Sequence, residues 1–327
     1  MAIQKIKVKV PYYKRLRASS FHDVHDVTRF WVTVDIWYDD TWGTGGQARP
    51  VVLYSPGGGV REAFPLNHPA ALKYVEAGMI YVVAYYNHWG STDPDHTSTP
   101  PWNSGWNFYR RNFFSYAVRR AVNIQSALEF VVDKLGTLPE YTSKFRADTE
   151  NIFGIGQSQG GSTYLVWSYL CNTRDYDYYN YGIRVKGIIN SHGLAGTHSR
   201  GWYALDRMIN MLGRAFTNGR HKFVHIYNDP DNFGGYDVAQ RLRNAVSTAQ
   251  RESHSFLNFM DLGHVQDFTF NVNYFKSVLR GDEIPVSEMS DGTPVAIINE
   301  YQIQVFTPGD FPNSMLDERY PPENPQT

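Results

Sequence analysis

The chain has 327 residues, of which 42% are hydrophobic and 19% charged, the composition of a folded globular protein rather than a disordered one. Its 31 Lys and Arg residues balance 32 Asp and Glu residues, and the net charge of −1 favours neither a nucleic-acid partner nor an anionic membrane. The one cysteine, Cys171, excludes a disulfide within these residues. We expect no nucleic acid and no membrane as partners, and we leave the oligomeric state open.

We do not expect the first residues to act as a secretory signal peptide. Residues Met1–Val10 alternate charged and apolar side chains, as an amphipathic strand does, and lack an uninterrupted apolar core. The longest apolar stretch, around Met79–Tyr86, is far shorter than the roughly 20 residues that cross a bilayer. A cytoplasmic protein is the default expectation, and release or incorporation into a larger particle stays open.

The pattern of apolar residues predicts two antiparallel strands followed by alternating strands and helices. Lys5–Val10 alternates, and Phe30–Tyr38 is rich in β-branched and aromatic residues. Further strands are expected at Pro50–Tyr54, Ile80–Tyr85, Asn151–Ile155, Val185–Asn190, Phe223–Tyr227 and Ser255–Met260, and helices at Asn67–Ala77, Asn112–Leu135, Gln159–Leu170, Leu205–Phe216, Asp237–Gln250 and Phe268–Leu279. This order predicts an α/β fold with a mostly parallel central sheet, antiparallel N-terminal strands and helices on both faces.

We expect one main domain over residues 1–282, because no Gly/Ser-rich or Pro-rich linker divides that part of the chain. Residues 283–327 form a C-terminal extension of different character. Its apolar segment Val295–Val305 predicts a final hairpin or edge strand, and a Pro-rich tail follows.

The sharpest motif is Gly156-Gln157-Ser158-Gln159-Gly160, which fits G-x-S-x-G. It lies between an expected strand and an expected helix, where a tight turn strains the serine and lifts its hydroxyl above the sheet edge. Gln159 occupies the position at which a dinucleotide fingerprint needs its third glycine, and no G-K-[ST] loop occurs. Ser158 is therefore the predicted nucleophile.

A serine hydroxyl attacks well only when a base removes its proton and an acid orients that base. In this strand–turn–helix arrangement the chain order is serine, acid, histidine. His264 follows Gly263 in a loop after the last expected strand of the alternating series, and we predict it as the base. His192 also follows a strand end and is the alternative.

The orienting acid is expected in the loop after the strand that precedes His264. Asp231 is our first choice there, ahead of Asp229 and Asp237, and Asp237 is better explained as the N-cap of the next helix. The same stretch resembles a calcium loop, but Phe233 occupies a ligand position. We expect no metal and no cofactor.

Attack on an acyl carbon creates an oxyanion that needs two backbone N–H donors. Gln159, the residue after the nucleophile, is expected to supply one. The glycine run after the Pro50–Tyr54 strand can turn its N–H groups into the cleft, so Gly58 and Gly59 are the candidates for the other.

An aromatic loop between the Ile80–Tyr85 strand and the next helix carries Trp102, Trp106 and Tyr109. Prolines and a glycine interrupt this segment, as is typical of a surface loop rather than a core element. We expect the three aromatic side chains to form a wall of a substrate pocket.

The glycine run, the serine motif, Asp231 and His264, in this order, resemble the α/β-hydrolase superfamily over about residues 48–282. The turn around Ser158 is similar to those of cutinases, acyl-protein thioesterases and carboxylesterases, and the aromatic loop resembles polyhydroxyalkanoate depolymerases and feruloyl esterases. Pro56 replaces the histidine that usually precedes the oxyanion glycines.

The resemblance implies a serine esterase that forms an acyl-enzyme on Ser158, with Asp231 and His264 completing the triad and a bulky, aromatic or polymeric ester as substrate. Two other classes stay open. One is a serine peptidase of the prolyl-oligopeptidase type, and the other is a non-catalytic structural module on the same fold.

Overall fold

The computed structural model describes residues 2–11, 31–43, 45–57, 63–85, 113–172, 183–193, 222–229, 236–245, 254–260, 263–297 and 303–306. The helix expected at Leu205–Phe216 lies outside these ranges. So do six predicted site residues: Gly58, Gly59, Trp102, Trp106, Tyr109 and Asp231.

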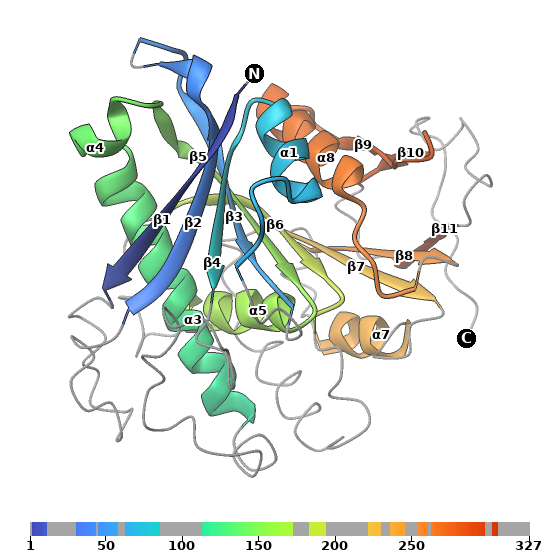
Figure 1. Cartoon of the computed structure of the whole chain (residues 1–327). Coiled ribbons are helices and arrows are strands. Elements are labelled where there is room, and N and C mark those ends of the chain that lie inside the picture. Colours follow the sequence, from blue (N-terminus) through green and yellow to red (C-terminus); the bar gives the residue numbers. More distant parts are fainter. Residues whose placement is uncertain are drawn as a thin grey trace.

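Within the described residues, nine strands form one sheet in the order β1-β2-β4-β3-β5-β6-β7-β8-β11 (Figure 1). Their bounds are Ile3–Pro11 (β1), Trp31–Asp39 (β2), Arg49–Ser55 (β3), Ile80–Tyr85 (β4), Ala147–Gln157 (β5), Val185–Ser191 (β6), Phe223–Asp229 (β7), His254–Met260 (β8) and Ile303–Phe306 (β11). β2 runs antiparallel to both β1 and β4, whereas every other neighbouring pair is parallel. The predicted mixed sheet with an antiparallel N-terminal edge is confirmed.

Helices cover both faces of the sheet, as predicted (Figure 1). α3, α5 and α7 pack on one face, and α1 and α8 on the other. Their bounds are Pro69–Glu76 (α1), Phe113–Phe130 (α3), Gln159–Asn172 (α5), Tyr236–Ala245 (α7) and Phe268–Arg280 (α8), with a π-helical turn at Val131–Leu135 and a short helix, α4, at Pro139–Thr142. The expected helix Asn112–Leu135 is thus an α-helix that ends in a π-helical turn.

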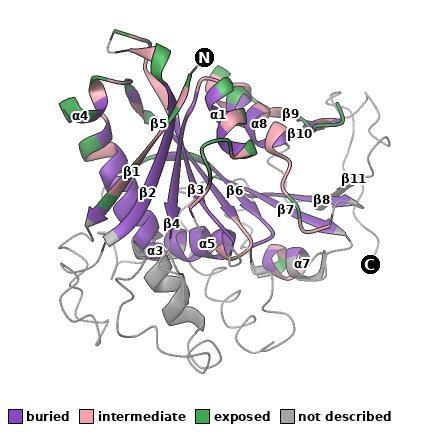
Figure 2. Ribbon diagram, in the orientation of Figure 1, coloured by how far each residue is buried: buried purple, intermediate pink, exposed green. Residues whose placement is uncertain are grey.

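The central strands are buried on both sides, which explains their uninterrupted apolar sequences (Figure 2). In β3, Val51 and Leu53 belong to the core beneath α3 and α5, while Val52 and Tyr54 belong to the core beneath α1 and α8. Alternate side chains of a strand point to opposite faces. One strand therefore serves two cores.

The start of β5 differs from the sequence-based expectation. β5 begins at Ala147 rather than Asn151, because a register shift opposite β3 accommodates the polar residues between them. The Asp148 carboxylate accepts hydrogen bonds from the Glu150 backbone N–H at 3.1 Å and the Asn151 side-chain amide at 2.6 Å, and these local contacts stabilise the irregular start. Apolar periodicity cannot detect such a segment.

The segment Val295–Val305 is divided between two elements. Val286–Glu288 (β9) and Pro294–Ala296 (β10) form an antiparallel hairpin against α8, and β11 joins the edge of the main sheet parallel to β8. Among the described residues, no helix is long and apolar enough to cross a membrane.

A buried chain of polar side chains connects three strands of the sheet. The Nδ2 of Asn190 on β6 lies 3.0 Å from Nδ1 of His225 on β7, and His225 Nε2 lies 2.9 Å from Nδ1 of His254 on β8. Because the Asn190 amide nitrogen can only donate, His225 accepts at Nδ1 and donates from Nε2 to His254. Burial lowers the pKa of both imidazoles, that of His254 to about 3, so both are neutral in the fold.

The buried pair His225 and His254 predicts that mild acid destabilises the fold. A histidine in an unfolded chain has a pKa near 6.5. Below that pH the unfolded chain binds protons that the folded chain does not bind, and the free energy of unfolding therefore falls. Each histidine contributes a loss of about 1.4 kcal/mol per pH unit until its folded pKa is reached. His254→Gln keeps an acceptor for His225 and does not titrate. The free energy of unfolding, measured by urea unfolding, falls with pH between about pH 6 and about pH 4. We expect His254→Gln to make this fall smaller by about 1.4 kcal/mol per pH unit. Equal slopes in the two proteins would contradict this account.

Candidate active site

Ser158 occupies the turn between β5 and α5 with a backbone φ of +52°, in the left-handed region that non-glycine residues rarely adopt. Such a conformation costs on the order of 1–2 kcal/mol. Two hydrogen bonds hold it: the Ser158 N–H donates to the carbonyl of Ser191 at 2.7 Å, and its own carbonyl accepts from the Ser162 N–H at 3.2 Å. The predicted strained strand–turn–helix context of Ser158 is confirmed, and its role as nucleophile stays a prediction.

The glycines around this turn are required by close backbone contacts. A Cβ at Gly156 would lie 2.3 Å from the carbonyl oxygen of Gly160, and a Cβ at Gly160 would lie 1.9 Å from that of Ser55 at the end of β3. Real Cβ atoms do not approach backbone so closely, and the backbone has no room to yield. The G-x-S-x-G pattern therefore reflects the packing of α5 against β3 and β5.

The loop that leaves β3 passes beside Ser158. A Cβ built on Gly57 would lie 3.6 Å from the Cβ of Ser158, so the first residue of the glycine run borders the candidate nucleophile. The other candidate donor, Gln159, is the first residue of α5, and its N–H belongs to the positive end of that helix dipole. Both observations support an anion-stabilising site beside the Ser158 side chain.

The predicted base and its alternative lie next to each other. His264 is partly exposed and follows Gly263, whose φ is +64°, in the loop between β8 and α8. The Asn228 side-chain amide at the end of β7 donates to the carbonyls of Gly263 and Val265 and anchors this loop. The ring centroids of His264 and His192 are 4.9 Å apart, with planes tilted by 54°. The structure thus brings both candidate histidines to the carboxyl edge of the sheet where Ser158 lies.

The candidate acids are only partly described. Asp229 is the last residue of β7, which places it at the same carboxyl edge, and Asp231 follows beyond the described residues. Asp237 lies inside the first turn of α7, which begins at Tyr236, and is not the N-cap that we expected. An aspartate in a first helical turn is favoured by the helix dipole.

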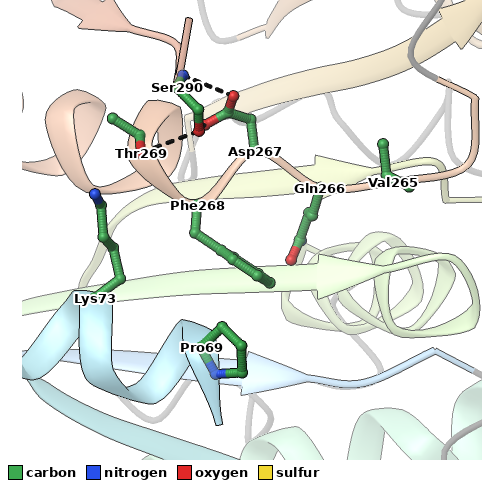
Figure 3. A pocket seen from close by; sticks show the side chains of 8 residues that line it. All are labelled: Pro69, Lys73, Val265, Gln266, Asp267, Phe268, Thr269 and Ser290. Atoms are coloured by element: carbon green, nitrogen blue, oxygen red, sulfur yellow. Dashed lines mark hydrogen bonds between the residues drawn. The ribbon is translucent and has the colours of Figure 1, made fainter.

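A cavity of about 250 Å³ adjoins the segment that follows His264 (Figure 3). It lies between the first turns of α1 and α8 and is lined by Pro69, Lys73, Val265, Gln266, Asp267, Phe268, Thr269 and Ser290. Asp267 caps α8 by accepting from the Phe270 N–H at 2.9 Å, and it also accepts from the Ser290 backbone N–H at 2.9 Å. The Asp267 carboxylate therefore stabilises the fold here, because it joins the start of α8 to Ser290.

Within the described residues, no group of three or more His, Cys, Asp or Glu side chains is arranged to hold a metal ion.

No protein-family model matches the sequence, and no curated protein matches it significantly. Among solved structures, a lipase/esterase from Lactobacillus plantarum is similar with a TM-score of 0.52 and 13% identity, over 86% of this chain and 97% of that one. A prolyl endopeptidase structure (TM-score 0.48, 13% identity, 80% of this chain) and a puromycin-hydrolysing peptidase from Mycobacterium tuberculosis (0.49, 15%, 75%) are also similar. The chain spans 35% and 38% of the lengths of these two peptidases.

The strand order, the parallel strands covered on both faces and the Lactobacillus plantarum structure agree on one architecture. The chain has the α/β-hydrolase fold. At these identities the comparison establishes the fold, and the chemistry has to be argued from the site itself.

The packing of the turn predicts a sharp contrast between two glycine substitutions. Gly160→Ala forces a methyl group into the Ser55 backbone and should lower the free energy of unfolding by at least about 3 kcal/mol. Gly45→Ala is the control: no atom lies within 4 Å of the added Cβ, and we expect a change within about 0.5 kcal/mol. Urea unfolding curves measure both. A Gly160→Ala protein as stable as the control would show that the turn is not packed as described.

Proposed function

We propose that this protein is a serine hydrolase that cleaves carboxylic esters through an acyl-enzyme on Ser158. The observation that carries the proposal is the left-handed turn of Ser158, which Gly57 borders and which lies at the same sheet edge as His264. Strain of this kind is retained where surrounding packing enforces it, and it clusters at active sites.

In the proposed reaction, Ser158 Oγ attacks the acyl carbon while His264 accepts the hydroxyl proton. The carbonyl oxygen becomes an oxyanion that accepts hydrogen bonds from the N–H of Gln159 and from the Gly58–Gly59 loop. When the C–O bond to the alcohol breaks, His264 returns its proton to the leaving oxygen. Water, deprotonated by His264, then attacks the acyl carbon of the acyl-enzyme. The bond to Ser158 Oγ breaks, His264 returns the proton to Oγ, and the acid is released.

The triad predicts a large loss of turnover from either of two substitutions. Ser158→Ala or His264→Ala should lower kcat for a p-nitrophenyl ester by several powers of ten, because the nucleophile and the base act as a unit. Both side chains lie at strand ends and are partly exposed, so the melting temperature should change little. If His264→Ala retained near-wild-type turnover, the base would be His192 instead.

The acid is tested by two neighbouring aspartates. Asp231→Asn should keep the fold but favour the wrong imidazole tautomer, lowering kcat on the order of 10⁴-fold by analogy with known triads. Asp229→Asn, the matched control two positions earlier, should lower it much less. The opposite ranking in steady-state kinetics would assign the acid to Asp229.

The substrate class rests on the aromatic loop. We infer that Trp102, Trp106 and Tyr109 contact a bulky, aromatic or polymeric ester, since aromatic faces stack on sugars, phenolic groups and polymer surfaces. A panel of p-nitrophenyl esters of graded acyl length, run beside a polyester film, a feruloylated sugar and aminoacyl p-nitroanilides, tests both class and reaction. Cleavage of anilides in preference to esters would favour the peptidase alternative.

A further inference from the structure

Ser191, the last residue of β6, and His192, the residue after it, lie beside the two members of the proposed catalytic pair. The carbonyl of Ser191 accepts the N–H of Ser158 at 2.7 Å, which fixes the turn of the nucleophile. The very next residue, His192, places its imidazole 4.9 Å from that of His264. One dipeptide therefore connects the backbone of the nucleophile to the ring of the base.

His192 is held rigidly in an unfavourable backbone conformation. Its φ is +57°, and apart from Ser158 it is the one described non-glycine residue with a positive φ. Its backbone N–H donates to the carbonyl of Ile226 on β7 at 2.8 Å, and its Nδ1 lies 2.8 Å from the Ser191 hydroxyl. The side chain is fully buried, and the Tyr227 ring meets it edge-on at 6.5 Å.

The segment beneath His192 is equally constrained. The side-chain oxygen of Asn190 lies so close to Gly161 in α5 and to Gly193 that an added Cβ would approach it to 2.1 Å and 2.0 Å. The Tyr227 hydroxyl donates to the carbonyl of Gly193 at 3.0 Å. The first turn of α5 and the end of β6 are thus locked together, and His192 has a fixed position relative to Ser158.

Glycine and asparagine adopt a positive φ more readily than histidine does, yet histidine occupies position 192. Neither would present a ring to His264. The Asn228 amide anchors the loop of His264 through the carbonyls of Gly263 and Val265, and the ring of His192 lies beside the His264 imidazole itself. Side-chain misplacement of about 1 Å at a catalytic centre can cost about 10²-fold in rate.

We propose that His192 is a positioning residue, whose buried ring forms a fixed wall that orients the His264 imidazole toward Ser158. The inference rests on the proposed function in taking His264 as the base. It assigns His192 no proton transfer: what matters is a flat ring at this place, held by the left-handed backbone of residue 192.

Two substitutions of His192 distinguish the packing of its ring from the chemistry of its imidazole. His192→Gly removes the ring but suits the left-handed backbone. We expect it to lower kcat for a p-nitrophenyl ester about 10- to 100-fold, with KM unchanged within about twofold, because orientation and not binding is lost. His192→Phe keeps a flat ring of similar size and should retain kcat within about threefold. Tyr141→Ala, which removes a buried ring of α4 just before the start of β5, is the control for lost stability and should leave kcat unchanged.

Two results would overturn the proposal. Wild-type turnover in His192→Gly would show that the ring does not orient His264. An equal loss in His192→Phe and His192→Gly would show that the imidazole chemistry of His192, and not its packing, matters.

A wild-type protein that hydrolyses no ester would contradict the proposed function alone. The packing is then measured by NMR from the His264 ring protons, assigned with His264→Gln. Their shifts should change strongly in His192→Gly, and unchanged shifts in that variant would overturn the contact itself.

Discussion

The hydrogen bond from the Ser158 N–H to the carbonyl of Ser191 is the interaction on which the site depends. β5 and β6 pair in parallel up to Gln157 and Ser191, and this bond extends their contact by one residue into the turn. It holds Ser158 in the left-handed conformation that separates strand from helix. Because the turn is so tight, α5 lies directly on the backbone of β3, which only glycine at position 160 permits.

Three of the described histidines illustrate two kinds of surroundings. His225 and His254 lie inside the sheet, bonded to each other, stacked on Phe223, and kept neutral by burial. His264 instead lies in a loop, and its side chain is partly exposed. The first pair couples strand packing to pH, whereas the proposed base lies outside the core in this loop.

Much of the fold could be predicted from the sequence because its signals are local. The strand at Ile80–Tyr85 has the predicted bounds, since an apolar run buried on both faces follows the helix-ending Gly78. The serine turn was recognisable because its motif lies between a strand and a helix. The polar start of β5 escaped prediction, because local hydrogen bonds to Asp148, and not an apolar pattern, hold its residues.

The arrangement around His192 could not have been predicted, because it depends on residues far apart in the chain. Sequence rules would assign the left-handed conformation in Ser191-His192-Gly193 to the glycine. In the structure His192 has the left-handed conformation. Glycine is needed at position 193 because its backbone approaches the Asn190 side chain closely. The same holds for the histidine pair on β7 and β8, whose contact follows only from strand order. The acid and the substrate wall remain predictions from the sequence.

The most direct test of the account is the covalent reactivity of Ser158. The wild-type protein would be incubated with a fluorophosphonate, and the modified peptide identified by mass spectrometry after proteolysis. The account predicts a single adduct on the peptide that carries Ser158, formed much more slowly when His264 is replaced. No adduct, or an adduct on a different residue, would contradict a serine hydrolase acting through this turn and would favour a structural role for the fold.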